Sequence, residues 1–138
     1  MCIRDSFTEE IIGEVQASRS DFTMSEDDNV LVIGVNGDKG ALGYFGYSYY
    51  LENKNMINTV AVDGGEGCVA PTSETIENGT YMPLARPLLI YVNKTSLKKP
   101  EVKTFVEYYL VNAEQLVEEV GYVKLPDGGY EAGLAEIR

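Results

Sequence analysis

The sequence predicts an α/β fold, and three features of the pattern support this prediction. Short apolar runs over residues 41–45, 57–62 and 88–92 have the length of buried strands. Segments with helical periodicity lie between and after them, the longest over residues 100–120. Turns rich in Gly, Asn, Asp and Pro separate the two kinds of segment. Alternation of strands and helices is typical of α/β proteins.

The first element is a helix over residues 7–15. Phe7, Ile11, Ile12 and Val15 recur at helical spacing, with glutamates between them. This pattern begins abruptly, as though a longer helix had been cut into. The preceding MCIRDS has no apolar core, so no signal peptide is visible, and a complete gene product of this sequence would be cytoplasmic.

A polar segment, residues 16–26, leads to the second element. Asp27-Asp28-Asn29 precedes the apolar run VLVIGV. Acidic residues before an apolar run are typical of a helix N-cap, but the run itself also fits a short strand, and the pattern leaves both open. Residues 36–40, NGDKG, have the composition of a turn.

The central part of the chain continues the alternation. A strand at 41–45 is followed by a helix at 47–55 and a strand at 57–62, and then by a loop, DGGEG. A short helix follows over residues 71–78, with Thr72 or Ser73 as its cap and Gly79 at its end.

The last part of the chain begins with a strand, LLIYV, over residues 88–92. The element with the clearest sequence pattern is a single long helix over residues 100–120, which Pro100 opens and Gly121 ends. A last helix is expected over residues 129–137. Pro83 and Pro87 are consistent with a crossover between two substructures.

Composition excludes some classes of function. The 138 residues suffice for one domain with a sizeable core, and no apolar run is long enough to span a membrane. A net charge of −11 argues against binding to nucleic acid or an anionic membrane. A single small anion is still possible, because backbone N–H groups, hydroxyls and a helix N-terminus can hold one.

Several motifs have a chemical reading and a structural one. Residues 34–40 lack the order of a phosphate loop and fit a tight turn. Residues 25–29 suit a cation site, a helix cap with a solvated acidic face, or a turn that lines an anion cleft. Residues 63–67 suit a metal or phosphate loop, or a surface connection. The aromatic cluster suits base stacking or internal packing; it comprises Tyr44, Phe45, Tyr47, Tyr49 and Tyr50.

Nucleophilic catalysis has little support. The chain has no histidine to activate a nucleophile, so Cys68 is expected to be a small buried or loop residue. Cys2 lies in the N-terminal segment MCIRDS.

Three stretches together resemble the phosphate-specific periplasmic binding proteins, the PstS family. The first, residues 18–54, contains SRSDF, SEDDN and GYFGY; the second, residues 69–94, is VAPTSETIENGTYMPLARPLLIYVNK; the third, residues 100–137, contains GYVKLP. The resemblance runs from about Phe7 to the C-terminus and is long and collinear.

The resemblance implies a two-lobed periplasmic-binding-protein-like fold of type II, of which this chain holds the C-terminal half. Residues 1–6 would be a non-native leader. Residues 7–83 would form part of the second lobe, and residues 84–138 the returning, C-terminal part of the first lobe, where the helix at 100–120 packs on a sheet with strands from outside the chain.

The family's main ligands, a Ser-Gly-Thr turn with an Arg and an Asp, precede the matched region. An ungapped carry-over places Met1-Cys2-Ile3 where that turn belongs; a rival alignment places Arg4, Asp5 and Ser6 on the family's Arg, Asp and Ser. Among the remaining residues, Ser25, Asp28 and Asn29 are expected to border the cleft.

The function implied is the solute-binding component of a phosphate ABC transporter. It would bind inorganic phosphate in the periplasm as a monomer and deliver it to the permease subunits of the inner membrane. No catalytic residue, metal, cofactor or nucleic acid is implied. The alternatives are a sensor or phosphatase-associated protein of the same fold, and a binder of another oxyanion such as sulfate or arsenate.

Overall fold

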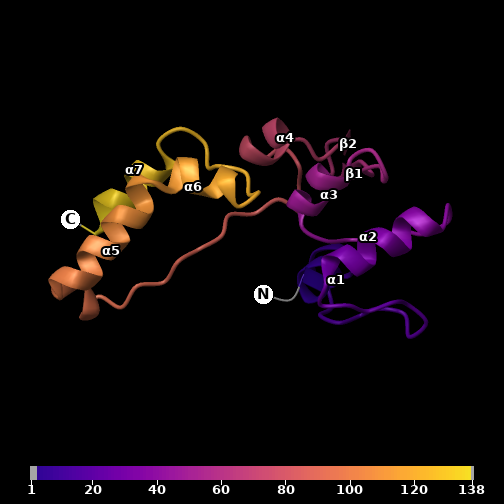
Figure 1. Cartoon of the computed structure of the whole chain (residues 1–138), viewed down its shortest axis with the longest axis horizontal. Helices are drawn as coiled ribbons and strands as arrows, with labels where there is room; N and C mark the ends of the chain where they lie inside the picture. Colours follow the sequence, from indigo (N-terminus) through magenta and orange to yellow (C-terminus); the bar gives the residue numbers. More distant parts are fainter. Residues whose placement is uncertain (1–2, 138) are drawn as a thin grey trace.

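The computed structural model describes residues 3–137. Figure 1 shows two groups of elements joined by a long extended stretch between α4 and α5. The first group holds a two-stranded sheet, and the second holds only helices. The elements are α1 (Ile3–Ile12), α2 (Asp28–Gly37), α3 (Tyr47–Asn53), β1 (Val62–Asp63), β2 (Cys68–Val69), α4 (Ser73–Glu77), the 3₁₀ helix η1 (Ser96–Lys98), α5 (Pro100–Val111), α6 (Ala113–Glu119) and α7 (Gly129–Glu136).

The first helix, α1, begins earlier than expected and ends at Ile12. Gly13 follows it with φ +82° and donates its N–H to Glu9 O at 2.9 Å. The expected apolar stripe of this helix is not buried, because Ile11 and Ile12 are exposed.

The ambiguous run VLVIGV is a helix. The side chain of Asp27 accepts the N–H of Asn29 at 3.0 Å, which satisfies one of the free donors at the start of α2. The capping prediction at 71–78 is also confirmed. Thr72 caps α4 and forms a reciprocal pair of hydrogen bonds with Thr75, at 3.1 and 2.9 Å.

The prediction that segments 41–45, 57–62 and 88–92 form strands of a sheet is wrong. Within residues 3–137 the sheet consists of β1 and β2, which pair antiparallel as Val62 with Val69 and Asp63 with Cys68. Segments 41–45 and 88–92 belong to no sheet, and of 57–62 only Val62 pairs. A strand is stable only beside a hydrogen-bonded neighbour, and the described part of the chain supplies none to these segments.

The helix expected over residues 100–120 is two helices. Asn112 separates α5 from α6, and its side chain donates to Tyr108 O at 2.8 Å while its backbone adopts φ −100° and ψ 2°. An amide side chain that bonds the preceding turn competes with the helix ladder. The expected helices at 47–55 and 129–137 are confirmed as α3 and α7, and Pro100 opens α5 as expected.

The core is small for a chain of this length. Across the described residues, the buried apolar side chains are Val32, Ile57, Val106 and Ala113. Helix α5 packs against α7, where Leu110 lies beside Gly133. The expectation of a sizeable core within this chain is therefore not met. No helix in the described range is both long and apolar enough to span a bilayer.

Candidate functional site

The structure brings Ser25, Asp28 and Asn29 together at the N-terminus of α2. Ser25 Oγ accepts the N–H of Asp27 at 3.0 Å. Asp27 Oδ1 accepts both the backbone N–H of Asn29, at 3.0 Å, and its side-chain Nδ2, at 3.1 Å. The donors that an anion would use here are thus engaged by the chain's own carboxylate, in a helix cap.

Asp28 is the acidic residue of this group whose titration is perturbed. Partial burial raises the pKa of its carboxyl, and the nearby charges of Asp27 and Glu26 raise it further. The backbone amide of Gly46, directly before α3, acts in the opposite direction. The Asp28 carboxyl thus already accepts the Gly46 amide, and the negative charges of Glu26 and Asp27 beside it repel an anion.

The loop DGGEG between β1 and β2 is a turn closed on its own aspartate. Asp63 Oδ1 accepts the N–H of Gly65 at 2.8 Å and that of Gly67 at 3.0 Å. These two bonds hold the pKa of the Asp63 carboxyl below its usual range. The amides that would form a phosphate loop already bind a carboxylate, so the surface-connection interpretation fits better.

We expect this loop to loosen in acid. Because the folded pKa of Asp63 is lowered, its contribution is present above the unfolded value and is lost as the pH falls through the folded value. NMR titration should show the amide shifts of Gly65 and Gly67 moving with a midpoint below the ordinary aspartate pKa. Asp63→Asn should abolish this transition, whereas Glu66→Gln should preserve it. A midpoint at or above the ordinary aspartate value would contradict the assignment.

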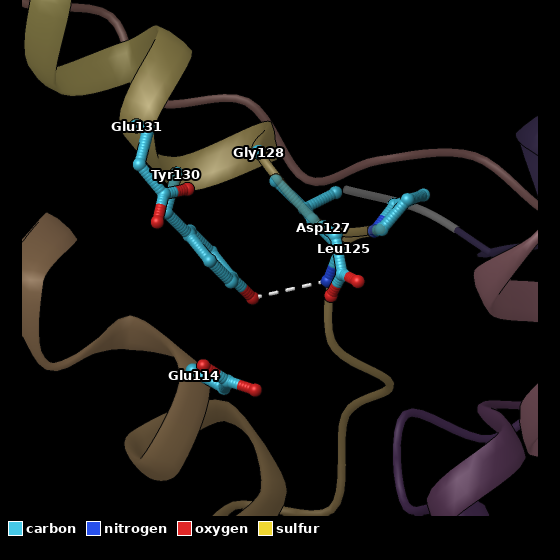
Figure 2. Close-up of a pocket in the computed structure, with 7 residues that line it drawn as sticks. Glu114, Leu125, Asp127, Gly128, Tyr130 and Glu131 are labelled. Carbon is cyan, nitrogen blue, oxygen red and sulfur yellow. Dashed lines mark hydrogen bonds between the residues drawn. The ribbon is translucent and has the colours of Figure 1, made fainter.

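A shallow pocket of about 180 Å³ lies where α6 meets the start of α7. Figure 2 shows Glu114 on one side of it and Asp127 and Glu131 on the other. Tyr130 Oη lies in the pocket and accepts the N–H of Leu125 at 3.1 Å. With three carboxylates on its wall, this pocket is unsuited to an anion.

A second pocket of about 200 Å³ is lined by Leu51, by Ser73 and Glu77 of α4, and by residues 121–124. Its one cationic side chain, Lys124, contacts Glu114 Oε1 at 2.9 Å. That hydrogen bond raises the pKa of Lys124. The lysine is thus paired with one carboxylate of the neighbouring pocket and gives this one little positive charge.

Three tyrosines of the aromatic cluster take part in ring contacts. The ring of Phe7, in α1, stacks on Tyr44 with centroids 4.1 Å apart and planes 4° apart. Tyr47 and Tyr50 lie 5.8 Å apart in a tilted pair within α3. These rings contact one another, but they are half-buried and lie outside the small core.

The turn at 36–40 is held by Asp38 Oδ1, which accepts the N–H of Gly40 at 2.8 Å.

Two arginines that could bind an oxyanion are paired with carboxylates. Arg19 makes two hydrogen bonds to Asp21, at 2.7 and 2.5 Å, both in exposed surroundings. Arg86 lies 3.6 Å from Glu10 of α1, which links the crossover segment to the N-terminal helix.

One buried polar residue was not anticipated from the sequence. Thr8 is the most buried polar side chain in the described range; it donates to Asp5 O at 3.2 Å and accepts the N–H of Gln16 at 2.9 Å. Apolar periodicity cannot identify such a residue, because its burial depends on a hydrogen bond to a distant loop.

Three further predictions from the sequence concern a metal site, Cys68 and the N-terminal leader. Within residues 3–137 no three His, Cys, Asp or Glu side chains are grouped to hold a metal. Cys68 is exposed in β2, so it is a surface residue. Met1 and Cys2, and with them most of the expected leader and of the Met1-Cys2-Ile3 alignment, lie outside the described residues.

Comparison with known proteins gives strong similarities along nearly the whole chain. It is 47% identical over 135 residues to Protein SphX of Synechococcus elongatus, which covers 97% of this chain and 40% of that protein. It is 35% identical over 138 residues to the phosphate-binding protein PstS of Staphylococcus epidermidis, with 97% of this chain and 41% of the relative covered. The chain matches no protein-family model.

A solved structure shows the same fold. The crystal structure of a possible phosphate binding protein from Planctomyces limnophilus is 46% identical, with a TM-score of 0.80 over 97% of this chain and 48% of that one. This likeness confirms the fold class expected from the sequence, a partial two-lobed α/β binding-protein fold. The chain spans less than half the length of each of these relatives.

Proposed function

Because this chain is homologous to part of the SphX and PstS proteins, we propose that it is a portion of the solute-binding component of a phosphate ABC transporter. The similarity to a PstS named as phosphate-binding, together with a structural likeness along almost the entire chain, is the observation that carries this proposal. The whole protein would bind inorganic phosphate in the periplasm, as a monomer, and present it to permease subunits in the inner membrane.

The proposed division of the chain follows the extended stretch in Figure 1. Residues 7–83 would belong to the second lobe and residues 84–138 to the first, so the boundary falls between α4 and α5. Residues 1–6 would be a leader; of these, residues 3–6 continue α1. Two lobes joined in this way can close on an anion and exclude water.

The proposed role of Ser25, Asp28 and Asn29 is to border the cleft rather than to supply its main donors. Their polar groups already form the cap of α2. The principal donors would be the family's Ser-Gly-Thr, Arg and Asp, which precede the matched region in the ungapped alignment; in the rival alignment Arg4, Asp5 and Ser6 would supply the Arg, Asp and Ser. Asp28, as an acceptor, suits the single proton of hydrogen phosphate. Holding a phosphate needs no proton transfer, so no catalytic residue, metal or cofactor is invoked.

The test is a chimera of the S. epidermidis PstS in which this chain, from Phe7 onward, replaces the matched segment. Calorimetry with inorganic phosphate should give a Kd within about tenfold of that of the intact PstS, which is a difference of about 1.4 kcal/mol. Sulfate and arsenate, titrated in parallel, should bind more weakly.

A folded chimera that binds none of the three anions would overturn the proposal. Preference for sulfate or arsenate would favour the alternative oxyanion. Phosphate binding without any association with the permease would favour a sensor or phosphatase-associated role. The control is the PstS carrying its own segment through the same cloning and purification.

A further inference from the structure

Two asparagines of this chain are followed by glycine, at Asn36-Gly37 and Asn78-Gly79. At such a step the glycine nitrogen can attack the asparagine Cγ, because glycine has no side chain to hinder the approach. The surroundings of the two sites differ. Asn36 and Gly37 are the last two residues of α2, whereas Asn78 directly follows the short helix α4 and Gly79 has φ +74°. Both asparagines are exposed, so access to water does not distinguish them.

The side-chain oxygen of Asn78 accepts two hydrogen bonds from one residue. Asn78 Oδ1 lies 3.0 Å from the backbone nitrogen of Thr80 and 2.7 Å from its Oγ1, and both groups donate. The same hydroxyl has an alternative acceptor in Thr75 O, but at the longer distance of 3.4 Å. Attack on Cγ would place negative charge on Oδ1, and donors aimed at such an oxygen lower the barrier. Thr80 therefore provides at Asn78 what an oxyanion hole provides in an enzyme.

Two other asparagines each lack one of these features. Within the described residues, the side chain of Asn36 takes part in no hydrogen bond, although a glycine follows it. Asn93 Oδ1 accepts the N–H groups of Thr95 and Ser96, at 2.9 and 3.2 Å, but a lysine follows Asn93. The chain thus separates the effect of the glycine neighbour from the effect of the paired donors, and Asn78 combines the two.

The turn at Asn78 leads from α4 into the extended stretch shown in Figure 1. The N–H of Gly79 donates to Ile76 O at 3.2 Å, and that of Tyr81 donates to Thr75 O at 2.9 Å. The first bond is long and lies at the end of a short exposed helix, where local opening costs little. A β-linked aspartate at residue 78 would add one methylene to the backbone, so the turn could not keep both bonds.

We propose that Asn78 deamidates spontaneously and that Thr80 promotes the reaction. The nitrogen of Gly79 forms a bond to Asn78 Cγ, and the bond from Cγ to Nδ2 breaks. The proton of the Gly79 amide passes through solvent to the departing group, which leaves as ammonia. Water then opens the resulting succinimide to aspartate or to β-linked aspartate. The reaction needs water and no oxidant or reductant, and it does not depend on phosphate binding.

The test is incubation of the full 138-residue chain at neutral pH, followed by peptide mass spectrometry. Chromatography separates the aspartate and β-linked products. We expect Asn78 to convert at least about fivefold faster than Asn36 and Asn93 in the folded chain. In concentrated urea the rates at Asn36 and Asn78 should agree within about twofold, because unfolding removes both α2 and the ordered Thr80 donors.

Three variants identify the groups involved. Thr80→Val removes the hydroxyl and keeps the branched shape, and it should slow conversion of Asn78 at least about threefold without changing the rate at Asn36. Thr80→Ser keeps the hydroxyl and should stay within about twofold of the original rate. Gly79→Ala should slow conversion of Asn78 at least about tenfold, because the added methyl hinders the attacking nitrogen. Circular dichroism checks that each variant keeps the helices.

Equal rates at Asn36 and Asn78 in the folded chain would overturn the proposal. A preference for Asn78 that persists in urea would do the same, since it would then come from the local sequence. A folded Thr80→Val variant that converts as fast as the original, or faster, would show that the hydroxyl does not promote the reaction. If Thr80→Val loses helical structure, the rates at Asn36, Asn78 and Asn93 in the unmodified chain decide the matter.

Discussion

Titration of inorganic phosphate into the 138-residue chain is expected to give no binding tighter than about 1 mM, or about −4 kcal/mol. The reason lies in how the chain uses its own donors. At α2 the N-terminal amide of Asn29 binds Asp27, and between β1 and β2 the amides of Gly65 and Gly67 bind Asp63. A dehydrated oxyanion needs several converging donors, and these are occupied.

Electrostatics points in the same direction. The net charge is −11, and one of the two pockets is walled by Glu114, Asp127 and Glu131. Of the guanidinium groups in the described side chains, Arg19 and Arg86 both face carboxylates. Neither pair leaves a guanidinium group available to phosphate unless its ion pair is broken.

The matched control is the S. epidermidis PstS, titrated under the same conditions. Removing individual carboxylates is informative too. Asp63→Asn, which keeps the loop's size, is expected to leave phosphate binding undetectable, since it removes one negative charge but supplies no cation, and the amide oxygen can still accept the N–H groups of Gly65 and Gly67. Micromolar binding by the unmodified chain would show that it carries a complete anion site, and the view that most of the site lies elsewhere would then be wrong.

Local features of the fold were predictable from the sequence. The cap at Thr72, the acidic start of α2 and the glycine that ends α6 depend on residues within one or two turns of each other. The sequence therefore identified where helices begin and end more reliably than how segments pair.

The prediction of paired strands was wrong because strand pairing depends on long-range contacts. LLIYV has the composition of a central strand, but a strand is defined by hydrogen bonds to neighbours far away in sequence or in another polypeptide. The break between α5 and α6 was missed because it depends on the side chain of Asn112 bonding Tyr108 O, which the apolar periodicity does not reveal. For the site, the pattern grouped Ser25, Asp28 and Asn29 correctly in space, but their role at a cleft stays a prediction.

Gly121→Ala is expected to be strongly destabilising. Gly121 has φ +79° and ends α6 with two hydrogen bonds, its own N–H to Glu118 O and the N–H of Tyr122 to Val117 O, at 3.0 and 2.8 Å. This is the Schellman arrangement, which favours glycine. An added Cβ would also lie 2.8 Å from Ser48 Cβ in α3, an atom that cannot rotate away.

Both costs act together at this position. A non-glycine residue in the left-handed region costs about 1–2 kcal/mol, and forcing an extra methyl into a filled space costs about 1–3 kcal/mol. We therefore expect Gly121→Ala to lower the free energy of unfolding by about 2–5 kcal/mol, a large fraction of the stability of a small domain. Thermal and urea unfolding, followed by circular dichroism, measure it.

Gly128→Ala is the matched control, because Gly128 has φ +86° but no atom within 4 Å of an added Cβ. It should carry the backbone cost alone, about 1–2 kcal/mol. The difference between the two variants therefore measures the contact between the end of α6 and α3, which joins the two groups of elements seen in Figure 1. If Gly121→Ala proves no worse than Gly128→Ala, that contact does not hold the two groups of elements together in solution.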